Sequence, residues 1–166
     1  MVEEESALKV SVRSSVRTAK GREEMHADLI AAYQRTLYRL PLPDGTIDLS
    51  IGAPSPALDR LLVAHGATHW AWLTAFNPGS KILPDEENRA RFARLKDELA
   101  GFGWAYVEGV AVEPDGDWPD EPSLLVLEPD AERLRALARE HGQIACLAGE
   151  RGGAPQLILL TGVAPE

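Results

Sequence analysis

The stretch "THWAWLTAF", residues 68–76, decides the fold because it forms one unbroken apolar segment. Strands that are apolar on both faces usually lie in the centre of a sheet that is covered by helices. A helix is predicted from about Asp85 to Ala100, and "GWAYVEGVAV", residues 103–112, is predicted as the next strand. Strand, helix and strand in that order predict a parallel βαβ unit at the centre of the domain.

The segments on both sides of this unit predict further helices and strands. Helices are predicted over 55–66 and 131–142, because a capping side chain opens each one and a glycine ends it. An Asp-Gly turn at 44–45 predicts a hairpin. The remaining strands are predicted at 36–40, 47–52, 123–128, 144–149 and 156–162. The result is an α/β or α+β domain with a mixed sheet of about six or seven strands and helices packed on it.

Length and composition predict one globular domain. The chain has 166 residues, of which 45% are hydrophobic and 26% charged, and this suits a single hydrophobic core. Residues 25–166 are predicted to form that domain, and residues 1–24 a flexible tail that is in part basic and rich in serine. No apolar run is long enough to cross a bilayer, and "MVEEESALK" is not a signal peptide. We therefore expect a cytoplasmic protein without a membrane partner.

The net charge of −9 argues against nucleic acid as a partner. Nucleic-acid binding draws most of its affinity from Lys and Arg that neutralise phosphates. Outside the tail, the basic residues of this chain are scattered among acids.

Polar residues gather where the central strand ends and the next helix begins. Asn88 heads a helical stripe that continues through Phe92, Leu95, Leu99 and Phe102, so it should face the core. Ligands of open α/β sheets bind outside the carboxyl ends of strands, and the start of a helix favours anions. A polar pocket mouth is therefore predicted, surrounded by Asn77, Ser80, Glu87, Asn88 and Arg91.

A purely structural interpretation of this strand end stays open. Asn77 could hydrogen-bond its own backbone in an ordinary turn, and Glu87 could complement the helix dipole or pair with Arg91 one turn later.

The loop at 113–123, "EPDGDWPDEPS", adds three candidates. Glu121 is the carboxylate expected to act as a general acid or base, and it lies two residues before Ser123 on the same side of the strand. Trp118 either covers the crevice as a lid or packs on the edge of the core, and the second interpretation is favoured.

No metal or cofactor is expected. The acidic loop lacks the spacing of an EF-hand, and the four histidines do not form a zinc pattern. The glycine turn after the central strand has neither a Walker pattern nor the spaced glycines of a dinucleotide fold. The single cysteine, Cys146, lies in an apolar stretch and is predicted to be a buried core residue.

Four stretches together resemble a known family: "IGAPSPALDRLL", "LTAFNPGSKILPDEENRARFARLKDEL", "GDWPDEPSLLVL" and "HGQIACLAG". They are similar to the uncharacterised, mainly bacterial domain of unknown function family 3293, over about residues 28–160. The family pattern falls on Thr74, Asn77, Pro78, Ser80, Glu87, Asn88, Trp118, Glu121, Ser123, Gly142 and Gln143. The resemblance thus adds Gln143 to the ligand-binding candidates.

This sequence departs from the family pattern at three positions. Phe76 replaces a Trp, Pro84 replaces a helix-capping Ser or Thr, and His141 replaces a Phe. The family has no established activity, so the resemblance strengthens the site and leaves the function open.

Two hypotheses follow for the function. In the first, the domain binds a small polar or anionic molecule at the carboxyl end of the strand, and Glu121 is available for proton transfer if a reaction is catalysed. In the second, it is a non-enzymatic protein-interaction or regulatory module, which predicts a stable partner and an exposed apolar patch. The convergence of polar side chains favours the first.

Overall fold

The computed structural model describes the backbone of residues 19–160 and the side chains of residues 27–160. The helices of this part are α2 (Ala19–Arg35), α3 (Pro56–Ala64), η1 (Pro78–Ser80, a short 3-10 helix), α4 (Asp85–Phe102) and α5 (Ala131–Glu140). Its strands are β1 (Leu37–Leu42), β2 (Gly45–Leu49), β3 (His69–Leu73), β4 (Tyr106–Val112), β5 (Glu121–Leu127), β6 (Ala145–Glu150) and β7 (Gln156–Leu159).

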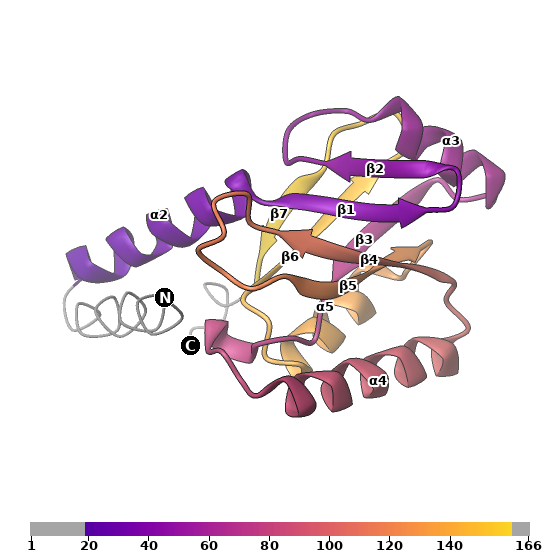
Figure 1. Cartoon of the computed structure of the whole chain (residues 1–166). Helices are drawn as coiled ribbons and strands as arrows, with labels where there is room; N and C mark the ends of the chain where they lie inside the picture. The colour runs from indigo at the N-terminus through magenta and orange to yellow at the C-terminus, as the bar shows by residue number, and fades with distance from the viewer. Residues whose placement is uncertain (1–18, 161–166) are drawn as a thin grey trace.

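The seven strands form one curled sheet in the order β2-β1-β4-β5-β3-β6-β7 (Figure 1). The α+β class and the strand number are therefore confirmed. All six strand pairs within residues 19–160 are antiparallel, so the sheet is not mixed. Strands β3 and β4 do run in the same direction around α4, but β5 lies between them. The predicted βαβ unit is thus a split one, within the order β3-α4-β4-β5-α5-β6.

Strand β3 is central because both of its faces are apolar. Trp70 and Trp72 point to one side of the sheet, and Ala71 and Leu73 point to the other. Helices α4 and α5 cover the side of Ala71, whereas α3 and the β1–β2 hairpin contribute to the core on the side of the tryptophans. Each fully buried side chain of this kind contributes about 2 kcal/mol to folding, so the two cores together hold the sheet in place.

Helix α4 buries the predicted stripe with one exception. Asn88, Phe92, Leu95 and Leu99 are buried, but Phe102 is 39% exposed and packs beside Trp104 with ring centroids 4.8 Å apart. The helix ends directly after Phe102, so its last turn extends beyond the sheet surface that the other side chains cover.

No side chain caps the start of α4, where Pro84 is the N-cap residue. Three acids fill the first turn and complement the positive end of the helix dipole.

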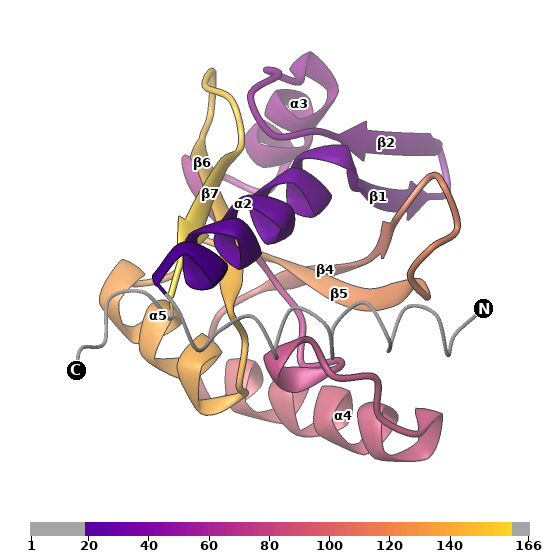
Figure 2. The ribbon, with the colours of Figure 1, turned by 90° about the vertical axis from the view of Figure 1, so that its left-hand side faces the viewer.

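The curl of the sheet leaves one end that α2 crosses. Figure 2 shows α2 running between the β6–β7 side and the β1–β2 side of the molecule. The two edges also approach each other, because Gly52 N after β2 donates to Pro155 O before β7 at 2.9 Å. Of the predicted tail, residues 1–18 lie outside the described residues, and residues 19–24 form the first turns of α2.

In the described part of the chain, no helix combines the length and the apolar character that crossing a membrane requires.

Candidate functional site

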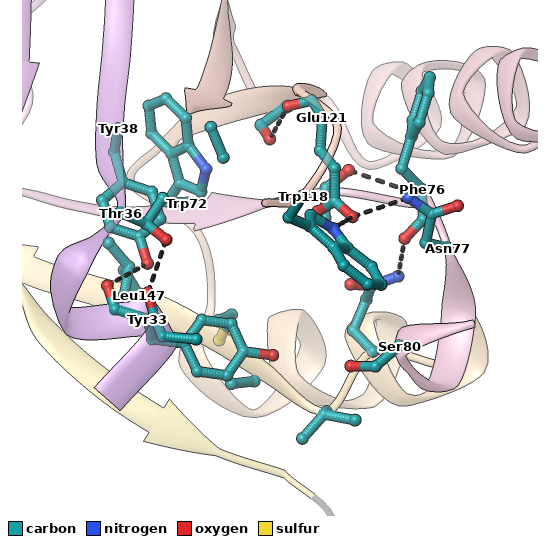
Figure 3. Close-up of a pocket in the computed structure, with 18 of the residues that line it drawn as sticks. Tyr33, Thr36, Tyr38, Trp72, Phe76, Asn77, Ser80, Trp118, Glu121 and Leu147 are labelled. Carbon is teal, nitrogen blue, oxygen red and sulfur yellow. Dashed lines mark hydrogen bonds between the residues drawn. The ribbon is translucent and has the colours of Figure 1, made fainter. Parts of the chain in front are cut away.

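A cavity of about 120 Å³ lies at the carboxyl ends of β3 and β4 and is bordered by α2 (Figure 3). Its walls come from segments that are far apart in the sequence, from α2 to β7. Six of the candidates from the sequence line it: Asn77, Ser80, Trp118, Glu121, Ser123 and Gln143. The strand end that was expected to hold a ligand borders this cavity.

Asn77 and Asn88 lock the strand end to helix α4. Asn77 has a left-handed backbone with φ 50°, and both side chains are buried. The side-chain oxygen Oδ1 of Asn88 accepts from Asn77 N at 2.8 Å, and the side-chain nitrogen Nδ2 of Asn88 donates to Asn77 Oδ1 at 2.8 Å. Leu83 N also donates to Asn77 Oδ1, at 3.0 Å. Asn77 therefore bonds residues six and eleven positions away rather than its own backbone.

The remaining amide nitrogen of Asn77 holds Glu121. Asn77 Nδ2 donates to Glu121 Oε2 at 2.8 Å, and Trp118 Nε1 donates to the same oxygen at 2.8 Å. Two rigid donors from different segments thus fix this carboxylate at the cavity wall. Trp118 is half-buried and lines the cavity, so its ring is a wall of the site and not only a contact at the edge of the core.

The two hydroxyl groups near this carboxylate donate hydrogen bonds to backbone carbonyl groups. Ser123 Oγ donates to Glu121 O at 2.8 Å, and Thr74 Oγ1 donates to Pro122 O at 2.7 Å. Ser123 is fully buried. These bonds fix the start of β5 against the end of β3, and so they position Glu121.

The turn at 77–80 is also held by the segment that follows α5. Gly79 N donates to Gly142 O at 2.7 Å, and Gln143 Nε2 donates to Phe76 O at 3.2 Å. Gly142 has φ +71°, and a Cβ there would lie 2.6 Å from Pro78 Cβ. A glycine is therefore required by both the backbone conformation and the close approach of Pro78.

Glu87 and Arg91 do not line the cavity, which corrects their predicted position at the pocket mouth. They do form the expected ion pair, with Arg91 Nη2 3.9 Å from Glu87 Oε2. Asn88 likewise stands behind Asn77 and not in the wall. The buried face of α4 is turned toward the sheet, so residues beside Asn88 on the helix point away from the cavity.

Helix α2 supplies a wall that was not predicted. Leu29, Ala32 and Tyr33 of α2 and Thr36 directly after the helix line the cavity, and their spacing of three, one and three is a helical stripe that the sequence does contain. Burial raises the pKa of the Tyr33 hydroxyl, and the nearby charge of Glu121 raises it further. Tyr33 therefore stays protonated at neutral pH and can donate a hydrogen bond.

Trp72 of β3 also lines the cavity, and it too was missed. Its side chain is only 3% exposed. Its Nε1–H has no hydrogen-bond partner among the described residues. Figure 3 shows the indole nitrogen turned toward the open space of the cavity. A buried donor without an acceptor costs about 1–3 kcal/mol, so its persistence at a cavity wall is informative.

Cys146 forms part of the cavity wall as a buried thiol. Burial raises its pKa to about 11, so it is protonated at neutral pH. The interpretation of Cys146 as a core residue is confirmed.

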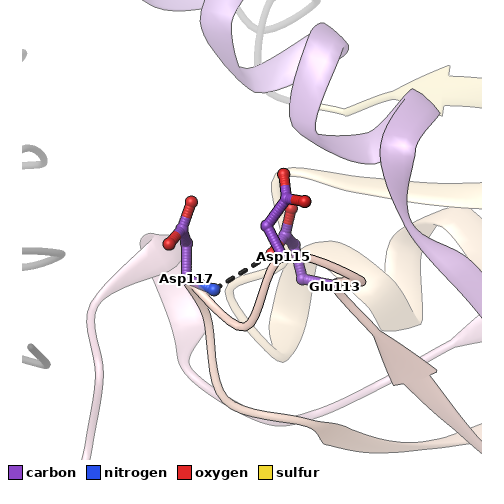
Figure 4. A group of neighbouring side chains, drawn as sticks. All are labelled: Glu113, Asp115 and Asp117. Atoms are coloured by element: carbon purple, nitrogen blue, oxygen red, sulfur yellow. Dashed lines mark hydrogen bonds between the residues drawn. The ribbon is translucent and has the colours of Figure 1, made fainter.

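The acidic loop gathers Glu113, Asp115 and Asp117, whose carboxylate oxygens lie within 4.8 Å of one another (Figure 4). One basic side chain, Arg35 at the end of α2, and one backbone N–H of the loop contact this group. Arg35 Nε lies 3.4 Å from Glu113 Oε2 and 4.0 Å from Asp115 Oδ2, and Asp117 N donates to Glu113 Oε1 at 3.0 Å. These contacts join the loop to the end of α2.

Fold and site together define an α+β domain of the split βαβ kind with a mostly apolar, partly open cavity at one end of its sheet, whose wall carries a few polar side chains. Residues 73–146 match the family DUF3293, described as a protein of unknown function. The predicted resemblance is confirmed, over a shorter range than the 28–160 expected. The matched range contains Asn77, Asn88, Glu121 and Gln143, whereas the wall from α2 lies before it. No curated protein and no solved structure is significantly similar to the chain.

Proposed function

We propose that this protein binds a small polar molecule in the cavity beside Asn77 and Glu121. The observation that carries the proposal is the fixed carboxylate of Glu121, which Asn77 Nδ2 and Trp118 Nε1 both hold at 2.8 Å on the cavity wall. A turn between a strand and a helix needs no such arrangement. A preorganised polar group in a mostly apolar concave site is what a ligand-binding pocket requires.

The charges of the cavity favour a neutral or cationic molecule over the anionic one that the helix start suggested. Glu113 and Glu121 line the cavity, and its described lining residues include no Lys, Arg or His. Arg35 Nε pairs with Glu113 Oε2 at 3.4 Å, so the preference over an anion comes from the fixed carboxylate of Glu121 and from the acidity of the whole chain. The net charge of −9 acts in the same direction at longer range.

If the bound molecule reacts, Glu121 is the group placed to move a proton. It is the carboxylate nearest to the donors of Asn77 and Trp118, and Tyr33 with its protonated hydroxyl lines the same cavity.

The alternative, a protein-interaction module, has weaker support. It predicts an exposed apolar patch, whereas the large hydrophobic side chains exposed among residues 27–160 are Val63 on α3 and Phe102 on α4. These two helices belong to different cores of the molecule.

A thermal-shift screen with a matched pair of variants tests the proposal. The panel contains amino acids, sugars, nucleosides, sugar phosphates and single-ring compounds, and each hit is measured by calorimetry. A ligand at a hundred times its Kd stabilises the fold by about 2.7 kcal/mol, which gives a clear rise in Tm. We expect Glu121→Gln to weaken binding at least about tenfold, since it removes the charge that the donors hold.

Glu87→Gln is the matched control, because it makes the same chemical change outside the cavity. It should bind like the parent protein. A compound that stabilises Glu121→Gln and the parent equally would have its site elsewhere and would contradict the proposal. A panel in which nothing stabilises the parent would contradict it as well.

A further inference from the structure

We propose that helix α2 (Ala19–Arg35) is a lid that rotates about Thr36 and so opens the cavity to an entering molecule. This inference rests on the proposed function, because it names the entry to the same site. The opening itself is measured without a ligand, so that failure of one proposal is distinguishable from failure of the other.

Helix α2 covers the cavity without belonging to either core of the molecule. Leu29, Ala32 and Tyr33 line the cavity from this helix. The side chains that form the two cores, or pack against them, nevertheless all lie outside residues 27–35. No side chain in this described part of α2 is fully buried, whereas α3, α4 and α5 each bury leucine side chains. Displacing α2 therefore breaks less apolar packing than displacing any of those three helices.

The polar contacts of α2 lie at its carboxyl end. The hydroxyls of Thr36 and Tyr38 donate to carbonyl oxygens of its last turn, at 2.7 and 2.9 Å. Arg35 in the same turn lies 3.4 Å from Glu113. Apart from the hydrogen bonds of the helix itself, the hydrogen bonds and ion pairs described for residues 27–35 all come from this turn. The helix is thus tied to β1 and to the loop after β4 at one end, and its first turns extend past the strands (Figure 1).

A single residue separates this helix from a fixed strand. Thr36 is the one residue between the end of α2 at Arg35 and the start of β1 at Leu37. Strand β1 is held on both sides by β2 and β4, and its Tyr38 and Leu40 are buried. Hinges are residues at the ends of elements that absorb a change in φ and ψ. Thr36 occupies such a position, because a rotation there moves α2 and leaves the sheet in place.

The other walls of the cavity are held more firmly than α2. Asn77 is buried and hydrogen-bonded to Asn88 of α4, and Trp72 belongs to one of the two cores. Trp118 is joined to Glu121 at the start of β5 by a hydrogen bond of 2.8 Å. Moving these walls breaks buried hydrogen bonds or core packing. The wall from α2 is therefore the one whose opening costs the least free energy.

A thiol on the cavity wall reports the opening. The chain has one cysteine, Cys146, which also borders the groove between α5 and the β6–β7 hairpin, so its thiol can be approached from that side. Ala145 is 8% exposed and borders the cavity but not the groove. The full-length reporter protein therefore carries Ala145→Cys together with Cys146→Ala. Its rate of reaction with dithionitrobenzoate, measured without urea and at low urea, gives the protection of the thiol.

We expect the reporter thiol to react at least about tenfold faster than global unfolding permits, with a protection that changes little at low urea, because a lid exposes little surface when it opens. Leu29→Ala in the reporter should raise the rate roughly fivefold, since it removes part of the contact that closes the lid. Ile30→Ala is the matched control. Ile30 is the next residue and is also half-buried, but it does not line the cavity, so the rate should stay close to that of the reporter.

Two results would overturn the lid. The first is a protection that equals the free energy of global unfolding and shares its dependence on urea. The second is an equal rate for Leu29→Ala and Ile30→Ala, because the reagent would then reach the thiol by a route that does not involve α2.

The outcomes also separate the two proposals. If a compound of the screening panel binds through Glu121 while the reporter thiol reacts only on global unfolding, the lid is wrong and the proposed function stands. If the lid opens as expected and no compound stabilises the parent protein, the proposed function is wrong and the motion of α2 stands.

Discussion

A glutamate lies at each end of strand β5, Glu121 as its first residue and Glu128 directly after its last, and the two carboxylates are held in different ways. Glu128, beside the start of β3, accepts from the backbone N–H groups of Thr68 and His69 and from the Thr68 hydroxyl. Glu121, beside the end of β3, accepts from the side chains of Asn77 and Trp118 and faces a cavity. The first carboxylate binds the backbone at the start of β3, and the second faces a cavity.

The difference in donors explains why the chemistry differs. Backbone N–H groups at the start of β3 hold the charge of Glu128 in place and lower its pKa to about 2. Glu128 itself takes a left-handed backbone with φ 54° to reach them. The side-chain donors to Glu121 can be removed one at a time by mutation. At the end of β3, a single substitution can therefore break a contact of the carboxylate without changing the backbone.

The largest effect is expected from Asn88→Ala, which breaks the support of the cavity end. The substitution removes the acceptor of Asn77 N and a donor to Asn77 Oδ1, both buried. Unsatisfied buried groups of this kind cost about 3 kcal/mol in total, and urea denaturation measures the loss.

Arg89→Ala is the control for Asn88→Ala. It removes an exposed side chain on the next residue, whose ion pair with Asp85 should contribute about 1 kcal/mol or less. Equal losses for the two variants would show that the bond between Asn77 and Asn88 does not hold the strand end.

The next effect is expected from Gly142→Ala, compared with Gly66→Ala. Both glycines follow a histidine at a helix end, with φ +71° and +66°, so the backbone penalty is shared. Only Gly142 also faces Pro78, where a Cβ would stand 2.6 Å away, whereas nothing lies within 4 Å of a Cβ at Gly66. We expect Gly142→Ala to cost about 2 kcal/mol more than Gly66→Ala in thermal or urea unfolding.

The crystal structure of Gly142→Ala should show the turn at 77–80 displaced. A difference near zero between the two glycine variants would mean that the turn yields freely and that the cavity end is not rigid.

The smallest effect belongs to the other end of β3 and depends on pH. The pKa of Glu128 falls from 4.5 to about 2 through its bonds to the backbone of Thr68, then to that of His69. A carboxyl whose folded pKa is lowered adds stability that is complete above its unfolded pKa and is lost as the pH falls through the folded value. Glu128→Gln should therefore lower the free energy of unfolding at pH 7, by an amount that shrinks below about pH 4.5 and disappears near pH 2.

Unfolding curves of parent and Glu128→Gln between pH 7 and pH 2 measure this difference. If the gap between them stays constant with pH, the carboxylate charge of Glu128 does not contribute through these bonds.

The residues that support the site could be predicted from the sequence more readily than the residues that line the cavity. A stripe of Asn88, Phe92, Leu95 and Leu99 required a buried amide with a buried partner, and the structure supplies Asn77. This inference succeeds because helical periodicity and the need to satisfy buried polar groups are both local rules. The same rules could have identified the stripe of α2 around Tyr33.

The order of the strands in the sheet could not be predicted from such local rules. The alternation of polar and apolar residues in β4 and β5 does not predict that β5 inserts between β3 and β4, because a hairpin can pair on either side of a strand. For the same reason the orphan indole of Trp72 could not be foreseen. Its surroundings are set by strands β5 and β6, which follow some fifty and seventy residues later in the printed sequence.

The insertion of β5 between β3 and β4 affects the order in which the parts of the molecule fold. Asn77 and Glu121 are 44 residues apart, and the length-dependent entropy of closing such a loop costs about 3 kcal/mol. Only the packing of β5 between its two neighbours offsets that cost. A chain that stops before β5 would lack the carboxylate of Glu121 and also the contacts of Gly142 and Gln143 to the turn of Asn77. A ligand of the cavity would therefore serve as a reporter of completed folding, because no state without β5 in place contains its site.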